Sequence, residues 1–321
     1  PFGYEPGDIF LGTVEGPSPD ARSALAEIAS FRQMLEVLQV EPVKGPAWKA
    51  AHIRTLDNHA AHLERSATFS IGVRDDRHMV TVAGTRSGKG TSAIIPALCT
   101  YPGSILVIDP KGENARRTVA RRGAGGPHCK GMGQATIVLD PYNTTGLPTD
   151  VQGRWNPLDL LQPDDVEMVD KASSIAEALV IRAKSEDAHF DESAIAFIKA
   201  LSLFVAITHA GRPTRNLLTV YDLLMRGMPE ELDPNRPDPK LSDAFMMLLI
   251  RMMEVPTLDG VIAGAAAALN DMSDRERGSV LSTARRNMAF LERPLMRAVL
   301  KDARFDLDRI KTDPKGTTLF L

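Results

Sequence analysis

The glycine-rich loop GTRSGKG (84–90) stands between a β-prone run, MVTVA (79–83), and an apolar helical segment, TSAIIPALCTY (91–101). A loop in this position can cradle a triphosphate, because its glycines let backbone N–H groups turn inward and the helix presents its positive end to the anion. Such a loop also needs a lysine that reaches the β- and γ-oxygens, and Lys89 provides it. The sequence therefore predicts a P-loop that binds a nucleoside triphosphate, with ATP as the expected nucleotide.

The loop departs from the strict P-loop pattern at two positions. Ala83 occupies the first glycine slot, and Gly90 stands where Ser or Thr normally ligates Mg²⁺, so that Thr91 or a water must take over. A plain glycine-rich turn is the alternative, but few turns place Gly-Lys-Gly directly ahead of a helix and after a buried strand. The candidate nucleotide-binding residues are Gly84, Thr85, Arg86, Ser87, Gly88, Lys89, Gly90 and Thr91, with Lys89 as the catalytic residue.

Hydrolysis would also need an acidic residue at the end of a second strand to hold Mg²⁺. Asp109 ends the run SILVID (104–109) and, with Lys111, marks a possible magnesium or phosphate neighbourhood. The alternative is that Asp109 caps the next segment, because Asp-Pro-Lys-Gly is strong turn chemistry. Asp140 ends ATIVLD (135–140) and has the same two interpretations, with less support because no Lys or Glu follows closely.

The bulk composition excludes several classes of protein. A sequence of 321 residues, 43% of them hydrophobic, is long enough to bury a core and form about two domains. The net charge of −3 does not demand nucleic acid, although a basic face could still exist. Cys99 and Cys129 form no CxxC pair, and His59 and His62 have no evident third ligand, so the sequence predicts neither a disulfide framework nor a protein metal cluster. The apolar stretch 193–209 is too short to span a membrane.

The order of patterns along the sequence predicts an α/β fold. Apolar runs separated by helical segments, including the charged stretch 113–122, indicate a parallel sheet buried on both faces. A long block without strand signals follows, and the final TTLFL (317–321) returns to β character, as a strand rejoining the sheet would. Helices are expected from 23 to 38, after Asp164, and near 191–209, 219–226, 241–253, 257–271 and 278–292.

These motifs, in this order, resemble the conjugative coupling proteins of type IV secretion systems, which are hexameric ATPases related to septal DNA translocases. The resemblance begins with AGTRSGKGTSAIIPAL (83–98) and SILVIDPKGEN (104–114). RWNPLD (154–159), DESAIAFIKAL (191–201) and SVLSTARRNMAFLERP (279–294) continue it, so that it covers about 79–321.

The resemblance implies a RecA-like P-loop NTPase sheet interrupted by an all-α domain. The divisions expected are an N-terminal segment over 1–77, the first part of the nucleotide-binding domain over 78–163, the all-α domain over 164–294 and a return to the nucleotide-binding domain over 295–321. Gly90 is ordinary in that family, and Asp109 would belong to an Asp-Pro-Lys-Gly-Glu motif rather than supply the main magnesium-binding acid. That acid and a membrane anchor would lie outside these residues. We therefore expect a piece of a longer protein with negligible turnover.

The function implied is an ATP- and Mg²⁺-dependent motor at the cytoplasmic face of the bacterial inner membrane. It would form a hexamer and move single-stranded DNA or a protein–DNA conjugate to the secretion channel, with relaxase or effector proteins and channel components as partners. Two alternatives are a recruitment platform whose assembly nucleotide controls, and a septal-type double-stranded DNA translocase, against which the large helical insertion argues. Two basic clusters could form solvated faces or contact phosphates: Arg116, Arg117, Arg121 and Arg122, and Arg285, Arg286, Arg293 and Arg297.

Overall fold

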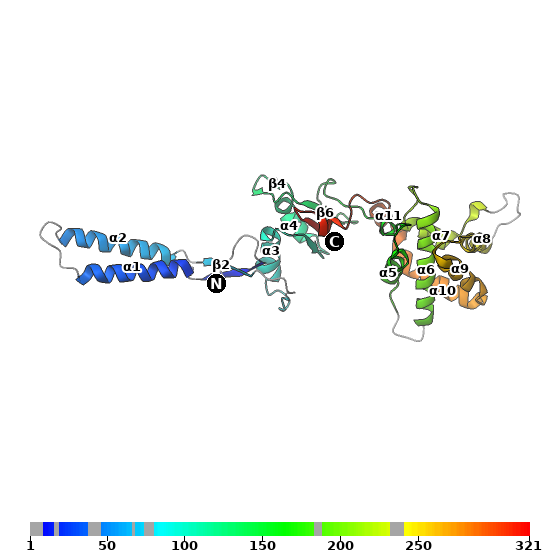
Figure 1. The fold of residues 1–321 in the computed structure, drawn as a ribbon, viewed down its shortest axis with the longest axis horizontal. Coiled ribbons are helices and arrows are strands. Elements are labelled where there is room, and N and C mark those ends of the chain that lie inside the picture. Colours follow the sequence, from blue (N-terminus) through cyan, green and yellow to red (C-terminus); the bar gives the residue numbers. More distant parts are fainter. Residues whose placement is uncertain are drawn as a thin grey trace. The chain divides into compact units, whose positions relative to one another are not determined.

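The computed structural model describes residues 9–15, 19–37, 46–65, 68–73, 80–182, 188–231 and 241–321. The protein divides into two compact units. The first holds the N-terminal elements, the glycine-rich loop and the α4 region, and the second holds the helical block (Figure 1). No helix among the described residues has both the length and the apolar character needed to cross a membrane.

The N-terminal elements form a helical hairpin and a two-stranded ribbon. Strand β1 (Ile9–Glu15) pairs antiparallel with β2 (Thr68–Val73), and α1 (Pro19–Val37) and α2 (Pro46–Arg65), which lie between these strands in the sequence, run side by side (Figure 1). Arg32 of α1 forms an ion pair with Asp57 of α2 at 2.8 Å, which ties the helices together. The sequence predicted the first helix but neither the second helix nor the ribbon.

The predicted strand at 79–83 is wrong for its described part. Residues 80–84 belong to no helix or strand, and the side chains of Val80 and Val82 are 83% and 89% exposed. Alternating Val and Thr favour a strand only where a neighbouring strand can pair with it, and the sheet described next ends at β3. The predicted helix after the loop is confirmed: a π-helical turn over Gly90–Ile94 continues into α3 (Ile95–Thr100).

Three strands form the parallel sheet. In spatial order they are β3 (Ile105–Val107), β7 (Thr317–Phe320) and β6 (Ala135–Val138), so the last strand in the sequence enters between two early ones. All four residues of β7 are buried, as its central position requires. These strands confirm the three predicted apolar runs at 104–109, 135–140 and 317–321, and α4 (Glu113–Arg122) confirms the charged helix.

Short elements complete this part of the protein. They are the hairpin of β4 (Gly125–Gly126) and β5 (Cys129–Lys130), and the single turn α12 (Arg309–Thr312).

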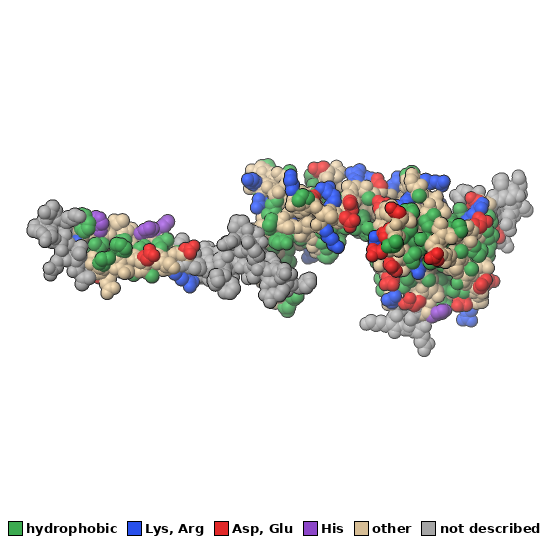
Figure 2. Space-filling view, in the orientation of Figure 1, with side chains coloured by type: hydrophobic (Ala, Val, Ile, Leu, Met, Phe, Trp, Pro, Cys, Tyr) green, Lys and Arg blue, Asp and Glu red, His purple; other side chains and the backbone are tan. Residues whose placement is uncertain are grey.

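An all-α block carries the largest hydrophobic core. Its helices are α5 (Met168–Leu179), α6 (Ala188–Thr208), α7 (Leu217–Arg226), α8 (Leu241–Met253), α9 (Val261–Asp271), α10 (Asp274–Met288) and α11 (Pro294–Leu300), with short 3-10 turns at Pro157–Leu160, Pro229–Glu231, Leu258–Gly260 and Ala289–Glu292. Helix α6 packs against α5, α7, α9 and α10 (Figure 1). The predicted helices of this block are confirmed, with ends that differ by a few residues. Acidic and basic side chains are interspersed on its visible surface (Figure 2).

The start and the end of the helical block run side by side. The Trp155 N–H donates to the Val299 carbonyl and the Arg304 N–H donates to the Arg154 carbonyl, both at 2.9 Å. Arg154 also forms an ion pair with Asp302 at 3.2 Å. The segments that precede and follow the helical block are therefore held together by two backbone hydrogen bonds and an ion pair.

Candidate nucleotide-binding loop

The loop before α3 contains two residues in the left-handed region of backbone space. Gly88 has φ 83° and Arg86 has φ 62°. Glycine adopts this conformation without strain because it lacks Cβ, whereas an arginine there is uncommon. The two reversals turn the backbone between residues 80–84 and the helix. Gly84, Thr85, Arg86, Ser87 and Gly88 are all exposed.

The Lys89 side chain folds back over the beginning of its own loop. Its ammonium donates to the carbonyls of Ala83 at 2.6 Å and Gly84 at 2.7 Å. These two contacts join the end of the loop to its beginning and hold the positive charge of Lys89 next to Ala83 and Gly84. The structure thus places the predicted lysine against the first residues of the loop.

The backbone N–H groups that begin the helix are open. Within the described part of the protein, the N–H groups of Gly88, Lys89 and Gly90 have no hydrogen-bond partner. The Gly88 carbonyl, in contrast, accepts from the N–H groups and hydroxyls of both Thr91 and Ser92, at 2.8 to 3.1 Å. Helix-terminal N–H groups carry a partial positive charge. The loop therefore combines free donors with the Lys89 cation.

Asp109 lies two residues after β3 and caps α4. It is 9% exposed; its Oδ2 accepts from the Ala115 N–H at 2.9 Å, and its Oδ1 accepts from the Asn114 side chain at 3.3 Å. This geometry favours the capping interpretation of Asp109. Lys111 is exposed in the turn, and Gly112 has φ 64°, as the turn requires.

Two members of the first arginine cluster, Arg121 and Arg122, are structural, which corrects the expectation that this cluster forms a solvated face or contacts phosphates. Arg122 is fully buried and donates to the carbonyls of Leu98, Tyr101 and Gly103 and to the Thr318 hydroxyl. Arg121 donates to the carbonyls of Cys99 and Lys130, at 2.9 and 2.6 Å. Only Arg116 and Arg117 of this cluster are exposed.

Helical spacing could have revealed Arg122. It lies on the same face of α4 as Ala115 and Val119, which are buried.

The second arginine cluster is also spread over separate contacts. Arg285 donates to the Leu224 carbonyl at 3.1 Å, and burial lowers the pKa of its guanidinium. Arg293 donates to the Tyr142 hydroxyl at 3.0 Å. Arg286 is exposed, and Arg297 forms an ion pair with Asp222 at 3.1 Å.

The geometry defines an α/β protein in which a glycine-rich loop with open N–H groups and a lysine stands at the start of a helix. The sequence profile of the family described as type IV secretory system conjugative DNA transfer matches residues 40–321, and the chain belongs to this family. The conjugal transfer protein TraG of Escherichia coli is 27% identical over 252 residues, covering 76% of this chain and 35% of that protein. Protein VirD4 of Agrobacterium fabrum is 31% identical over 150 residues, covering 46% of this chain and 20% of that protein.

The sequence thus spans about a third of the length of its relative TraG. Among solved structures, the plasmid coupling protein TrwB in complex with the GTP analogue GDPNP aligns with a TM-score of 0.44 and 17% identity, over 77% of this chain and 51% of that one. The α/β class, with a parallel sheet interrupted by an all-α block, rests on the strands and helices described above.

Proposed function

We propose that the protein binds ATP through residues 84–91 and forms the nucleotide-binding part of a coupling ATPase that passes DNA to a type IV secretion channel. The observation that carries the nucleotide assignment is the set of free N–H groups from Gly88 to Gly90, next to the Lys89 ammonium. Oxyanions bind such a helix start through backbone N–H groups, and a lysine then neutralises the outer phosphates. Family membership supports the link to conjugative DNA transfer.

Mg²⁺ would be held mainly by the phosphates of the nucleotide. No group of three or more His, Cys, Asp or Glu side chains in the described ranges could hold a metal ion. Mg²⁺ commonly keeps several waters and binds one or two protein oxygens together with substrate phosphates. We propose the Thr91 hydroxyl as the protein oxygen that binds Mg²⁺, because Gly90 stands where a P-loop normally has a Ser or Thr ligand. Asp109 serves as the cap of α4.

The partners follow from the family rather than from a contact surface. We propose single-stranded DNA, relaxase or effector proteins and secretion-channel components as partners, a hexamer as the working assembly, and the cytoplasmic face of the inner membrane as its place. TraG is named for conjugal transfer, and a VirD4 relative in Bartonella quintana is named a type IV secretion system-coupling protein.

Titration calorimetry with ATP and Mg²⁺ tests the nucleotide assignment on the unaltered protein and on Lys89→Ala. Loss of the ammonium should weaken ATP binding about ten-fold or more, which corresponds to about 1.4 kcal/mol. The matched control is Lys301→Ala, because Lys301 is an exposed lysine in the return from the helical block. Equal ATP affinity of Lys89→Ala and the unaltered protein would show that the loop is not the site.

A further inference from the structure

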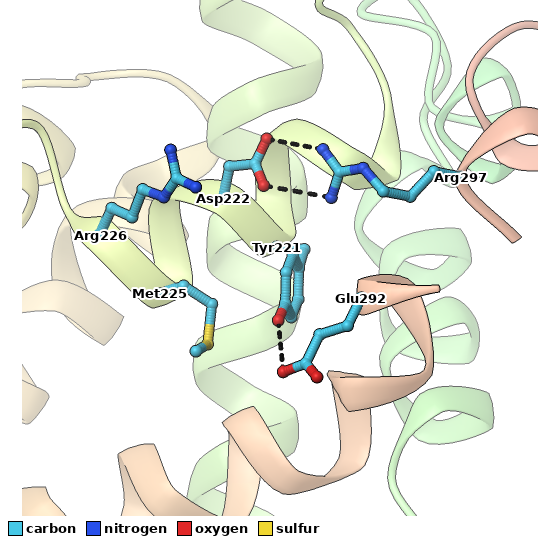
Figure 3. A pocket seen from close by; sticks show the side chains of 6 residues that line it. All are labelled: Tyr221, Asp222, Met225, Arg226, Glu292 and Arg297. Atoms are coloured by element: carbon cyan, nitrogen blue, oxygen red, sulfur yellow. Dashed lines mark hydrogen bonds and ion pairs between the residues drawn. The ribbon is translucent and has the colours of Figure 1, made fainter. Parts of the chain in front are cut away.

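A second candidate site is a cavity within the all-α block. Its volume is about 500 Å³, and it opens between α7 and the segment that joins α10 to α11 (Figure 3). Its lining residues are Tyr221, Asp222, Met225, Arg226, Glu292 and Arg297. A cavity of this size accommodates a ligand of a few residues or a small molecule. None of its lining residues belongs to the glycine-rich loop.

Two of the four charged side chains are already paired. Arg297 donates to both oxygens of Asp222, at 3.3 and 3.1 Å, in the bidentate geometry seen in Figure 3. This pair joins α11 to α7 and neutralises its own charges. Asp222 and Arg297 therefore form one wall of the cavity.

The other two charged side chains have unused capacity. The Tyr221 hydroxyl donates to Oε1 of Glu292 at 2.9 Å, which leaves Oε2 as a free acceptor at the rim. Arg226 has neither a hydrogen bond nor an ion pair with any residue in the described part of the protein. In Figure 3 the Arg226 guanidinium and the Glu292 carboxylate lie on opposite sides of the Tyr221 ring. A cation and an anion thus face the same cavity across an apolar surface.

We propose that this cavity binds a short peptide segment of a partner protein through a carboxylate, supplied by an acidic side chain or by the C-terminus of the peptide. The carboxylate would accept from the Arg226 guanidinium, whose fork of N–H donors matches its two oxygens. Oε2 of Glu292 would accept a backbone N–H of the same peptide, and Tyr221 and Met225 would cover its apolar part. This proposal goes beyond nucleotide binding and does not depend on it.

The carboxylates in the cavity favour a peptide over nucleic acid. A nucleic-acid strand brings a negative charge with every nucleotide and needs a series of cations. The cavity instead offers one unpaired guanidinium, and the Glu292 carboxylate on the other side of the Tyr221 ring would repel a second phosphate. A peptide combines one carboxylate with neutral N–H donors. The carboxylate matches the Arg226 guanidinium, and an N–H donor matches the free oxygen of Glu292.

The test follows the methyl signal of Met225, because this side chain lines the cavity. The whole protein, with its 13 methionines labelled with ¹³C at the methyl group, is titrated with small peptides, and Met225→Leu identifies the signal. The probes are N-acetyl-Ala-Glu-Ala-amide, the matched Ala-Gln-Ala amide, the Ala-Gln-Ala peptide with a free C-terminus, and a hexameric oligothymidylate. We expect saturable shifts with one or both carboxylate peptides, the two arms distinguishing an acidic side chain from a free C-terminus.

Arg226→Gln should weaken binding of the carboxylate peptide about ten-fold, as loss of a charge-assisted hydrogen bond implies. Arg275→Gln removes the same charge from an exposed position at the start of α10 and should leave the affinity unchanged, as should Lys89→Ala. Unchanged signals of the other methionines show that each variant is folded.

Three outcomes would overturn the proposal. They are equal shifts with the neutral amide peptide, undiminished affinity in Arg226→Gln, and a response to the oligothymidylate but to neither carboxylate peptide.

Discussion

The buried guanidinium of Arg122 joins three separated stretches of the sequence. It donates to Gly103 at 2.6 Å and, at 2.8 Å, to the Thr318 hydroxyl of β7, which in turn donates to the side-chain oxygen of Gln134 at 2.9 Å. No carboxylate is among its hydrogen-bond partners in the described residues, so carbonyl dipoles compensate the charge. Burial lowers the pKa of Arg122 to about 10, so the guanidinium stays protonated at neutral pH.

Arg122→Met should lower the free energy of unfolding by about 3–5 kcal/mol, because it leaves several buried acceptors without a donor. Urea denaturation followed by circular dichroism measures this loss. Arg117→Met, at an exposed position of the same helix, should change the free energy by no more than about 0.5 kcal/mol. Equal effects of the two substitutions would contradict a structural role for Arg122.

Asp140 gives the protein a sensitivity to acid. Burial raises the pKa of its carboxyl, but hydrogen bonds from Thr144 and Thr145 outweigh burial, so the pKa lies below its ordinary value. The carboxylate accepts from the N–H groups of Thr145 at 2.8 Å and Thr144 at 3.0 Å. A depressed folded-state pKa adds stability above the unfolded-state value of about 3.9, and this stability disappears as the pH falls through the folded-state pKa.

Asp140→Asn should therefore lose less stability than the unaltered protein when the pH falls from about 5 to about 3. Urea midpoints at several pH values measure the difference. Asp164→Asn, which changes an exposed carboxylate, serves as the control and should retain the full acid dependence. A parallel decline in the Asp140 variant and the unaltered protein would refute the assignment.

At the scale of elements, helix α6 organises the all-α block. Its side chains from Ala200 to Ala206 are all buried, and Phe197 packs its ring against that of Phe245 of α8 with centroids 6.0 Å apart. A helix that is apolar on nearly every face must be surrounded by other helices, as α6 is.

Phe197→Ala should lower the free energy of unfolding by about 3–5 kcal/mol, because loss of the aromatic ring leaves a cavity in this core. Loss of helical signal in urea measures it. Met246→Ala, on the exposed part of α8, should cost far less. A small effect at Phe197 would mean that the block collapses around the missing ring.

Local patterns were sufficient for the helical block but not for every element. Helices α6 to α10 carry apolar residues at helical spacing, which the sequence displays directly. Helix α2 has no clear sequence signal, because polar residues interrupt its apolar stripe. The run at 79–83 has the composition of a strand, but a strand also needs a partner that local sequence does not specify.

At the candidate site, the sequence predicted the loop and Lys89 from spacing alone, and these assignments stay predictions. The conformation of the loop and its free N–H groups needed coordinates. The sequence leaves Asp109 with two interpretations, because strand-end and cap positions coincide there. It predicts a solvated face or a phosphate contact for Arg122, because arginine is seldom fully buried.

At the level of the whole molecule, the charge balance limits how the proposed DNA partner could bind. The net charge of −3 provides no long-range attraction, so DNA would have to meet local cations such as Arg117. Contacts to phosphates release counterions, and the affinity then falls steeply with salt.

Affinity for a single-stranded oligonucleotide should therefore drop about ten-fold or more between about 50 mM and about 200 mM salt, measured by fluorescence anisotropy. If Arg117 contacts a phosphate, Arg117→Ala should reduce the slope of log affinity against log salt by about 0.7. An affinity that does not change with salt would exclude binding through the phosphate backbone.

The helical block begins and ends at two segments that are hydrogen-bonded to each other, Arg154–Trp155 and Val299–Arg304. Its two ends are held one hydrogen bond apart, and the entropy of closing a loop grows only by about 0.6 kcal/mol for each doubling of its length. The entropic cost of closing an insertion of this length is therefore only slightly larger than the cost of closing a short turn between the same two segments. Relatives could therefore carry helical blocks of different length at this position while the order of the strands stays the same.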